Sequence, residues 1–208
     1  MATPQGTDDA PARERILTAA FSAFVEAGYA QTSTLEIARR ARVSKRELYA
    51  LVGNKQEMLV ACIQARAERF RVPADLPEPH DRASLEHTLV AFGTQLLRET
   101  TDTTVVSVFR LAIAEAVHAP EVAQALDRFG LRTSRAALTT LLAEAGSRGL
   151  LEGRPQELAE QFAGLLWGNT MVGLLLGTVE PPSSREITRR TRAAVTAFLQ
   201  LHPARDAS

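Results

Sequence analysis

The segment from residue 33 to residue 55, STLEIARRARVSKRELYALVGNK, constrains the fold of this chain more than any other. The pattern Ser-x-x-Glu occurs in it twice, as Ser33 with Glu36 and as Ser44 with Glu47. In such a capping box the serine hydroxyl accepts a hydrogen bond from the backbone N–H three residues on, and the glutamate reaches back to the serine. Each pair therefore predicts the start of a helix. We expect two short helices, with a tight turn at residues 42–43 between them and a stop at residues 53–54.

The turn between these two helices is rich in positive charge. Five cations lie between Arg39 and Arg46 with no acid among them, whereas the whole chain carries 24 basic and 24 acidic side chains and a formal net charge of zero. A local basic patch on a neutral chain indicates a confined contact with nucleic acid. Two short helices around a tight turn are typical of the helix-turn-helix, whose second helix lies in the major groove of DNA. The sequence thus favours a DNA-binding protein.

The residue types around the second helix suit this role. Lysine and arginine donate hydrogen bonds to guanine O6 and N7, and glutamate accepts one from cytosine N4. The residues expected at base edges are those at the start of the second helix: Ser44, Lys45, Arg46 and Glu47. Free backbone N–H groups at helix starts, and nearby hydroxyls and ammonium groups, suit phosphates. The remaining expected DNA contacts are Thr32, Ser33, Arg42, Tyr49 and Lys55.

Helical periodicity extends over the rest of the chain, and only 5% of residues are aromatic, so we predict an all-α fold. The first helix runs from Pro11 to about Ala27 and is capped by Gly28. Three prolines between residues 72 and 79 exclude a helix there. Residues 1–10 and 204–208 are expected to be tails. The other helices are predicted at residues 55–71, 84–100, 102–118, 120–147 with a bend at Gly130, 155–176 and 183–201.

Composition argues against several other classes of protein. The single Cys62 excludes an intrachain disulfide and a multi-cysteine metal site, and it indicates a cytoplasmic protein. No apolar run reaches the roughly 18 residues of a membrane span. The four histidines are scattered, and no phosphate-binding glycine loop occurs. We therefore expect no membrane contact, no metal and no cofactor, and we disfavour an enzyme.

The C-terminal half suggests a ligand site and a buried helix. Residues 161–177, QFAGLLWGNTMVGLLLG, are apolar almost all round, which predicts burial on more than one side, with Gly164, Gly168 and Gly173 allowing close helix approach. A mostly apolar cavity with a few polar groups is the usual form of a small-molecule site. The residues predicted to line it are Phe92, Leu96, Phe109, Ile113, Glu115, Phe129 and Trp167, although core packing explains each aromatic side chain as well.

Three pieces of the N-terminal segment, ILTAAFSAFVEAGYAQTS, EIARRARVSKRELY, and NK before Met58-Leu59, together resemble the DNA-binding domain of the TetR family of bacterial transcriptional regulators. The piece LAIAEAVHAPEVAQAL also resembles the AefR-like branch of that family. The resemblance implies nine or ten helices, a small-molecule effector and a homodimer formed by the last two helices. The family's DNA contacts carry over at Ser33, Ser44, Lys45, Tyr49 and Lys55. Dimer contacts are expected at Trp167, Met171, Val195 and Phe198.

The chain departs from the family pattern at three positions. Arg42 stands where the turn usually has glycine, which predicts strain in a left-handed backbone conformation. Val52 replaces a usual aromatic residue, and Arg46 replaces a residue that is usually small. The change at Arg46 is expected to alter base preference.

These observations predict a DNA-binding domain over residues 11–57 and an effector-binding and dimerisation domain over residues 58–203. The leading interpretation is a dimeric transcriptional regulator, a repressor released from a palindromic DNA operator by a small apolar effector. One alternative is a DNA-binding and dimerisation protein that takes no effector. Another is a small all-α enzyme.

Overall fold

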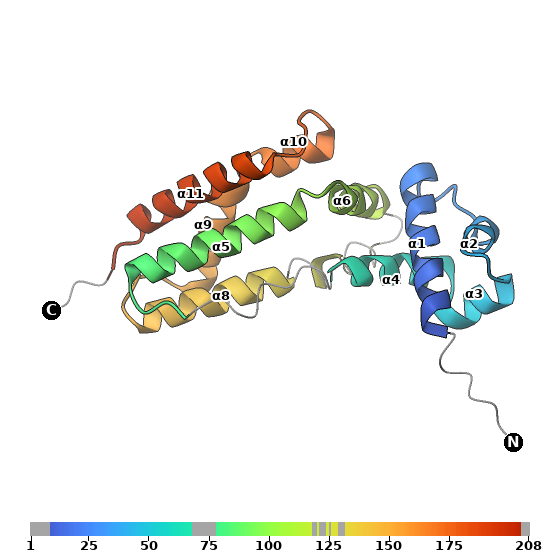
Figure 1. Cartoon of the computed structure of the whole chain (residues 1–208), viewed down its shortest axis with the longest axis horizontal. Coiled ribbons are helices and arrows are strands. Elements are labelled where there is room, and N and C mark those ends of the chain that lie inside the picture. The colour runs from blue at the N-terminus through green and yellow to red at the C-terminus, as the bar shows by residue number, and fades with distance from the viewer. Residues whose placement is uncertain are drawn as a thin grey trace, which may run out of the picture. The chain divides into compact units, whose positions relative to one another are not determined.

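The computed structural model describes residues 9–67, 78–117, 120, 124, 126–128 and 132–204. Within these residues it holds ten α-helices and no strand, so the predicted all-α class is confirmed (Figure 1). The packing divides the chain into two units. Residues 1–68 and 107–130 form the first, and residues 69–106 and 131–208 form the second. The functional boundary placed after residue 57 stays a prediction.

The first unit comprises α1 (Asp9–Ala27), α2 (Thr34–Ala41), α3 (Lys45–Val52), α4 (Lys55–Ala67) and the later part of α6 (Thr103–Glu115). Its core forms because apolar residues recur at helical spacing and are removed from water. Helix α1 contributes Ile16, Ala20 and Phe24, which are at most 1% exposed. Leu48 of α3 and Leu59 of α4 are fully buried in the same cluster. The short α3 is therefore held by its buried face.

The predicted helix boundaries around the turn are confirmed. Ser33 caps α2, and its hydroxyl accepts from the N–H of Glu36 at 3.1 Å. Ser44 forms a full capping box with Glu47 at the start of α3. Gly28 follows α1 with φ of 79°. Helix α1 begins at Asp9, two residues before the predicted start at Pro11.

The second unit comprises α5 (Arg82–Thr100), α8 (Arg132–Ser147), α9 (Pro155–Trp167), α10 (Thr170–Leu176) and α11 (Ser184–Leu201). Figure 1 shows α5 lying alongside α11. The rings of Phe162 and Phe198 meet edge to face with centroids 5.3 Å apart. Gly93 of α5 allows close packing, because an added Cβ would lie 2.9 Å from Thr191 Cγ2 and 3.3 Å from Leu166 Cδ1. Gly93 is thus the glycine at which α5 approaches its neighbours.

The single helix predicted over residues 155–176 is wrong, because it is broken between α9 and α10. Gly168 has φ of 45° and ψ of −132°, a conformation that side-chain-bearing residues avoid. The guanidinium of Arg190 donates to the carbonyls of Leu166 and Trp167 at 3.0 and 3.2 Å and so satisfies the end of α9. The predicted close approach at Gly164 is also not seen, since an added Cβ there would meet nothing within 4 Å.

Other boundaries differ by small amounts. Helix α5 begins at Arg82 rather than residue 84, because Asp81 and Ser84 form a capping box that the sequence reading missed. Asp102 precedes α6 and accepts from the N–H of Thr104 at 2.9 Å, as expected of an N-cap. Most of the proline-rich segment 72–79 and the predicted bend at residue 130 lie outside the described residues. Across the described ranges, every helix is too short or too polar to cross a membrane.

Candidate nucleic-acid interface

The N-terminal end of α3 presents its polar side chains to solvent. The N–H of Glu47 donates to Ser44 Oγ at 3.1 Å, and the N–H of Ser44 donates to Glu47 Oε2 at 3.4 Å. Lys45, Arg46 and Glu47 are exposed, whereas Leu48 is fully buried and anchors the helix. The carboxylate of Glu47 is thus shared between capping and any external contact. Lys45 and Arg46 project from the same end of the helix.

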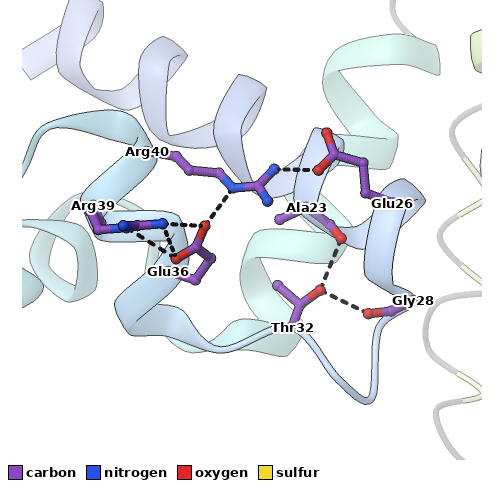
Figure 2. Close-up of polar contacts among 7 residues, drawn as sticks. All are labelled: Ala23, Glu26, Gly28, Thr32, Glu36, Arg39 and Arg40. Atoms are coloured by element: carbon purple, nitrogen blue, oxygen red, sulfur yellow. Dashed lines mark hydrogen bonds and ion pairs between the residues drawn. The ribbon is translucent and has the colours of Figure 1, made fainter.

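Two of the five cations in the turn region are already paired within the chain. Arg40 donates to Glu36 Oε1 at 2.8 Å and to Glu26 Oε2 at 2.7 Å (Figure 2). Arg39 donates to both oxygens of Glu36, at 3.1 and 3.2 Å. The hydrogen bonds from Arg40 and then Arg39 lower the pKa of Glu36, because they stabilise its charged form. Glu36 and Glu26 therefore link α2 to α1 and neutralise part of the basic cluster.

The side chains of the other three cations of this cluster are not paired with an acid of the described chain. Arg42, Lys45 and Arg46 are exposed, and neither the Arg42 nor the Arg46 side chain forms a hydrogen bond or ion pair with any described residue. Lys45 Nζ lies 5.9 Å from the ring centroid of Tyr49, one turn along α3. The phenolic oxygen of Tyr49 lies 3.2 Å from the hydroxyl of Thr34. The positive charge that faces solvent is therefore concentrated at the turn and the start of α3.

Thr32 lies in the chain interior, although the sequence placed it among the DNA contacts. Its side chain is only 5% exposed. Its hydroxyl lies 3.0 Å from the carbonyl oxygen of Ala23 and 2.7 Å from that of Gly28, and can donate to either (Figure 2). Since a threonine hydroxyl has one proton, its donor capacity is used at the end of α1. Thr32 is therefore a residue that positions the start of α2.

Lys55 is partly engaged by its own unit. Its Nζ donates to the carbonyl of Ala30 at 3.2 Å and lies 4.5 Å from the ring centroid of Tyr29. Burial lowers the pKa of Lys55, and the charge of Glu115 opposes that shift. An ammonium group has three donors, so two remain for a phosphate. Ser33 and Tyr49, the other predicted phosphate contacts, are exposed.

The predicted effector residues are divided between the two packing units. Phe92 is 2% exposed within the second core, and Leu96 and Trp167 are partly buried against it. Phe109 packs against the first core, Ile113 is 59% exposed and Glu115 is half-buried. Phe129 lies outside the described residues. Their assignment to one pocket stays a prediction.

The predicted dimer residues fall into two groups. Val195 and Phe198 are fully buried within their own chain, so they have no surface to offer a partner and form core instead. Trp167 and Met171 are partly exposed. The sequence pattern could not separate these groups, because a helix that faces its own core and one that faces a partner share the same apolar spacing.

Comparisons with known proteins agree with this geometry. The profile described as "Bacterial regulatory proteins, tetR family" matches residues 16–62, and "AefR-like transcriptional repressor, C-terminal domain" matches residues 87–202. The chain belongs to the TetR family. Members of this family are transcriptional regulators, so the chain is a DNA-binding helix-turn-helix protein and is no enzyme. Helices α2 and α3 are the two helices of its motif.

Individual relatives resemble the chain along most of its length. The TetR-family chain is 26% identical over 168 residues to the HTH-type transcriptional regulator YvkB of Bacillus subtilis (strain 168), covering 80% of this chain and 85% of that protein. A TetR-family regulator structure from Mesorhizobium loti has a TM-score of 0.81 at 26% identity, covering 96% of this chain and 100% of that one. The structure of the flavonoid-responsive regulator FrrA has a TM-score of 0.78 at 28% identity, with the same coverage of 96% and 100%.

One functional feature of the TetR motif in this chain was not predicted from the sequence. Arg39 and Arg40 belong to the basic cluster predicted to face DNA, yet Glu36 precedes them by three and four residues. That spacing, with the acid on the N-terminal side, is the favourable arrangement for an ion pair on a helix.

In the described part of the chain, no group of three or more histidine, cysteine, aspartate or glutamate side chains is placed to hold a metal ion.

Proposed function

We propose that this TetR-family protein is a dimeric repressor that binds a palindromic operator through α3 and is released by a small apolar effector. The observation that carries the proposal is the exposure of Lys45 and Arg46 at the start of α3. The nearby Arg39 and Arg40 are bonded to Glu36, so Lys45 and Arg46 are the better candidates for DNA contacts. A repressor of this kind acts in the cytoplasm.

The DNA contacts divide by chemistry. Lys45 and Arg46 read base edges, because their side chains are exposed at the end of the helix that enters the major groove. Ser44 and Glu47 contribute less, since they hold each other in the capping box. Ser33, Tyr49 and Lys55 are among the phosphate contacts. We do not propose Thr32 as a DNA contact, because its hydroxyl donates a hydrogen bond to a carbonyl inside the chain.

A titration on selected DNA tests this division. The probe is the duplex enriched by the purified protein from a random-sequence pool, compared with a scrambled duplex over a range of salt. We expect Lys45→Ala or Arg46→Ala to weaken operator binding by about 1–3 kcal/mol and to relax preference at one base position per half-site. Lys55→Ala should weaken both duplexes alike and reduce the salt slope by about one unit per half-site.

The matched control is Arg185→Ala. Arg185 is an exposed arginine near the start of α11, far along the chain from the motif. Its loss should leave both affinity and salt slope unchanged. Unchanged binding in a variant that lacks Lys45, Arg46 and Lys55 together would refute the interface.

The dimer rests on an apolar surface of α9, α10 and the residues that follow. Val172 is 58% exposed and Leu176 72% exposed, with Leu165 and Val179 also exposed nearby in sequence. Exposed apolar groups that gather in one region are characteristic of a protein interface. A second copy of the chain is the occupant we propose, because a palindromic operator requires two equivalent recognition helices.

Light scattering tests the dimer. The wild-type protein should have about twice the 22.6 kDa mass of one chain at micromolar concentration. Leu176→Glu should shift it toward the monomer, because a buried interface disfavours an unpaired charge. Val117→Glu is the control, since Val117 is 85% exposed and lies neither on this surface nor on the last two helices. A wild-type mass of 22.6 kDa would contradict the proposal.

The proposed effector is an apolar or amphipathic organic molecule. The support is the apolar character of Phe92, Leu96 and Trp167, together with the similarity to FrrA, which its description calls flavonoid-responsive. Trp167 is the single tryptophan, so its fluorescence reports on a ligand that reaches it. In an operator-release screen we expect flavonoids or other apolar compounds to release the DNA. Release by phosphorylated metabolites alone would overturn this part, and release by none would favour an effector-independent protein.

A further inference from the structure

We propose that Arg42 is a DNA-phosphate contact that the chain retains at the expense of backbone strain in the turn of its motif. The inference rests on the proposed DNA-binding function. It makes Arg42 a residue whose removal stabilises the protein and weakens its DNA binding at the same time.

The first observation is the backbone conformation. Arg42 has φ of 56° and ψ of 46°, and it is the one residue other than glycine with positive φ among the described positions. The six other positive φ values there all belong to glycines. The left-handed region is unfavourable for a residue with a Cβ and costs glycine nothing. Arginine at this position therefore strains the backbone, whereas glycine would adopt the same conformation without strain.

The strain cannot be relieved by a local change of backbone. The N–H of Val43 donates to the carbonyl of Ala38 at 3.1 Å, and the N–H of Arg42 donates to that of Arg39 at 3.2 Å. These bonds close the end of α2 and require a left-handed residue between the two helices. Val43 also packs against the first core. The turn geometry is thus fixed by both sides of Arg42.

The second observation concerns the side chain, which does nothing for the fold. It is exposed and makes no hydrogen bond or ion pair with any described residue, unlike Arg39 and Arg40 just before it. No contact within the described chain therefore offsets the strain. A strained residue without a structural role is a reason to look for a functional one.

The third observation is the surface around it. Arg42 lines an open groove between the N-terminal half of α1 and the end of α2, together with Arg15 and Arg40, and Glu14 is the one acid in the lining. Arg15 Nε donates to the carbonyl of Ala41 at 3.4 Å, which holds this second cation beside the turn. The complete lining is Pro11, Glu14, Arg15, Thr18, Ala19, Ser22, Arg40, Ala41 and Arg42. Arg40 is paired with Glu36 and Glu26, so the remaining positive charge of the groove comes from Arg15 and Arg42, against the single acid Glu14. This balance favours an anion.

The DNA backbone is the anion within reach. Arg42 precedes Ser44 by two residues, so their Cα atoms are separated by at most about 7 Å. Ser44 begins the helix that enters the major groove, and phosphates border that groove on both sides. A guanidinium forms paired hydrogen bonds to phosphate oxygens, which a lysine cannot reproduce. Contact with a phosphate adds affinity without adding sequence preference.

The test compares Arg42→Gly with wild type in thermal unfolding and in binding to the duplex enriched from the random pool. We expect Tm to rise by about 2–4 °C, because glycine adopts the turn without strain. We expect affinity to fall about five- to tenfold on both the enriched and the scrambled duplex, with a salt slope lower by about one unit per half-site. Arg42→Asn tolerates the same conformation without the charge and should lose affinity equally.

The controls separate this proposal from the assignment of α3. If Arg42→Gly binds both duplexes like wild type while Lys45→Ala loses the operator, the role of Arg42 is overturned and the proposed function stands. If neither variant changes binding, the DNA interface itself is refuted. A loss confined to the enriched duplex would make Arg42 a base reader and contradict the phosphate assignment. A lower Tm for Arg42→Gly would refute the claim that Arg42 strains the backbone of the turn.

Discussion

Replacing Thr32 with valine tests whether this residue serves the fold or the DNA. The hydroxyl lies in the interior, 2.7 Å from the carbonyl oxygen of Gly28 and 3.0 Å from that of Ala23. Valine preserves the branched shape of the side chain and removes the donor. The carbonyls at the end of α1 then lose a partner at a site that is only 5% exposed, where water cannot readily replace it.

The size of the effect follows from this burial. Leaving a buried acceptor unsatisfied costs about 1–3 kcal/mol, and here two acceptors share one proton, so we expect about 1–2 kcal/mol for the whole change. In a chain of this length a loss of that size lowers Tm by about 2–8 °C. The salt dependence of DNA binding should not change, because each lost phosphate contact would reduce its slope by about 0.9.

The assay pairs thermal unfolding with titration of the enriched duplex at several salt concentrations. Thr140→Val is the matched control, because the hydroxyl of Thr140 also donates to a helical carbonyl, that of Ala136 at 3.0 Å, but at an exposed site. We expect that control to stay within about 0.5 kcal/mol of wild type. An unchanged Tm for Thr32→Val, combined with a reduced salt slope, would show that Thr32 contacts DNA and that its inward placement is misassigned.

Two further variants probe the core packing, and a third probes the ion pairs of Glu36. Thr191→Val should raise Tm by about 2–4 °C, because the hydroxyl of Thr191 is buried with no hydrogen-bond partner in the described chain. Gly93→Ala should lower stability by about 1–3 kcal/mol in chemical denaturation, because its Cβ would lie 2.9 Å from Thr191 Cγ2. Glu36→Gln should be less stable than wild type at pH 7, and the difference should vanish at low pH. The folded pKa of Glu36 is lowered, so its contribution is present above about pH 4.3 and is lost as pH falls through the folded value.

Local chemistry explains which parts of the fold the sequence predicted. The capping boxes at Ser33 and Ser44 were predictable, because a cap is formed by residues three positions apart and needs no tertiary partner. The left-handed conformation of Arg42 was predicted from the resemblance to the TetR family, which usually has glycine at that position, and the structure confirms it. The break at Gly168 was not predictable, because it depends on Arg190, which lies 22 positions later and satisfies the end of α9.

The candidate site divides along the same line. The exposure of Lys45 and Arg46 followed from their place in the motif. The burial of Thr32 did not, because it depends on where the end of α1 meets the start of α2. The core role of Phe198 also needed the structure, since its partner Phe162 comes from another helix. Apolar spacing identifies a buried face without identifying what covers it.

The ratio of affinities for selected and scrambled DNA tests the central claim most directly. Lys45 and Arg46 face solvent at the start of α3, so the protein should enrich a near-palindromic duplex from a random pool. At physiological salt that duplex should bind at least about 10³-fold more tightly than a scrambled one. The same ratio should collapse when Lys45 and Arg46 are both changed to alanine. Equal affinity of the wild-type protein for both duplexes at every salt concentration would contradict the account.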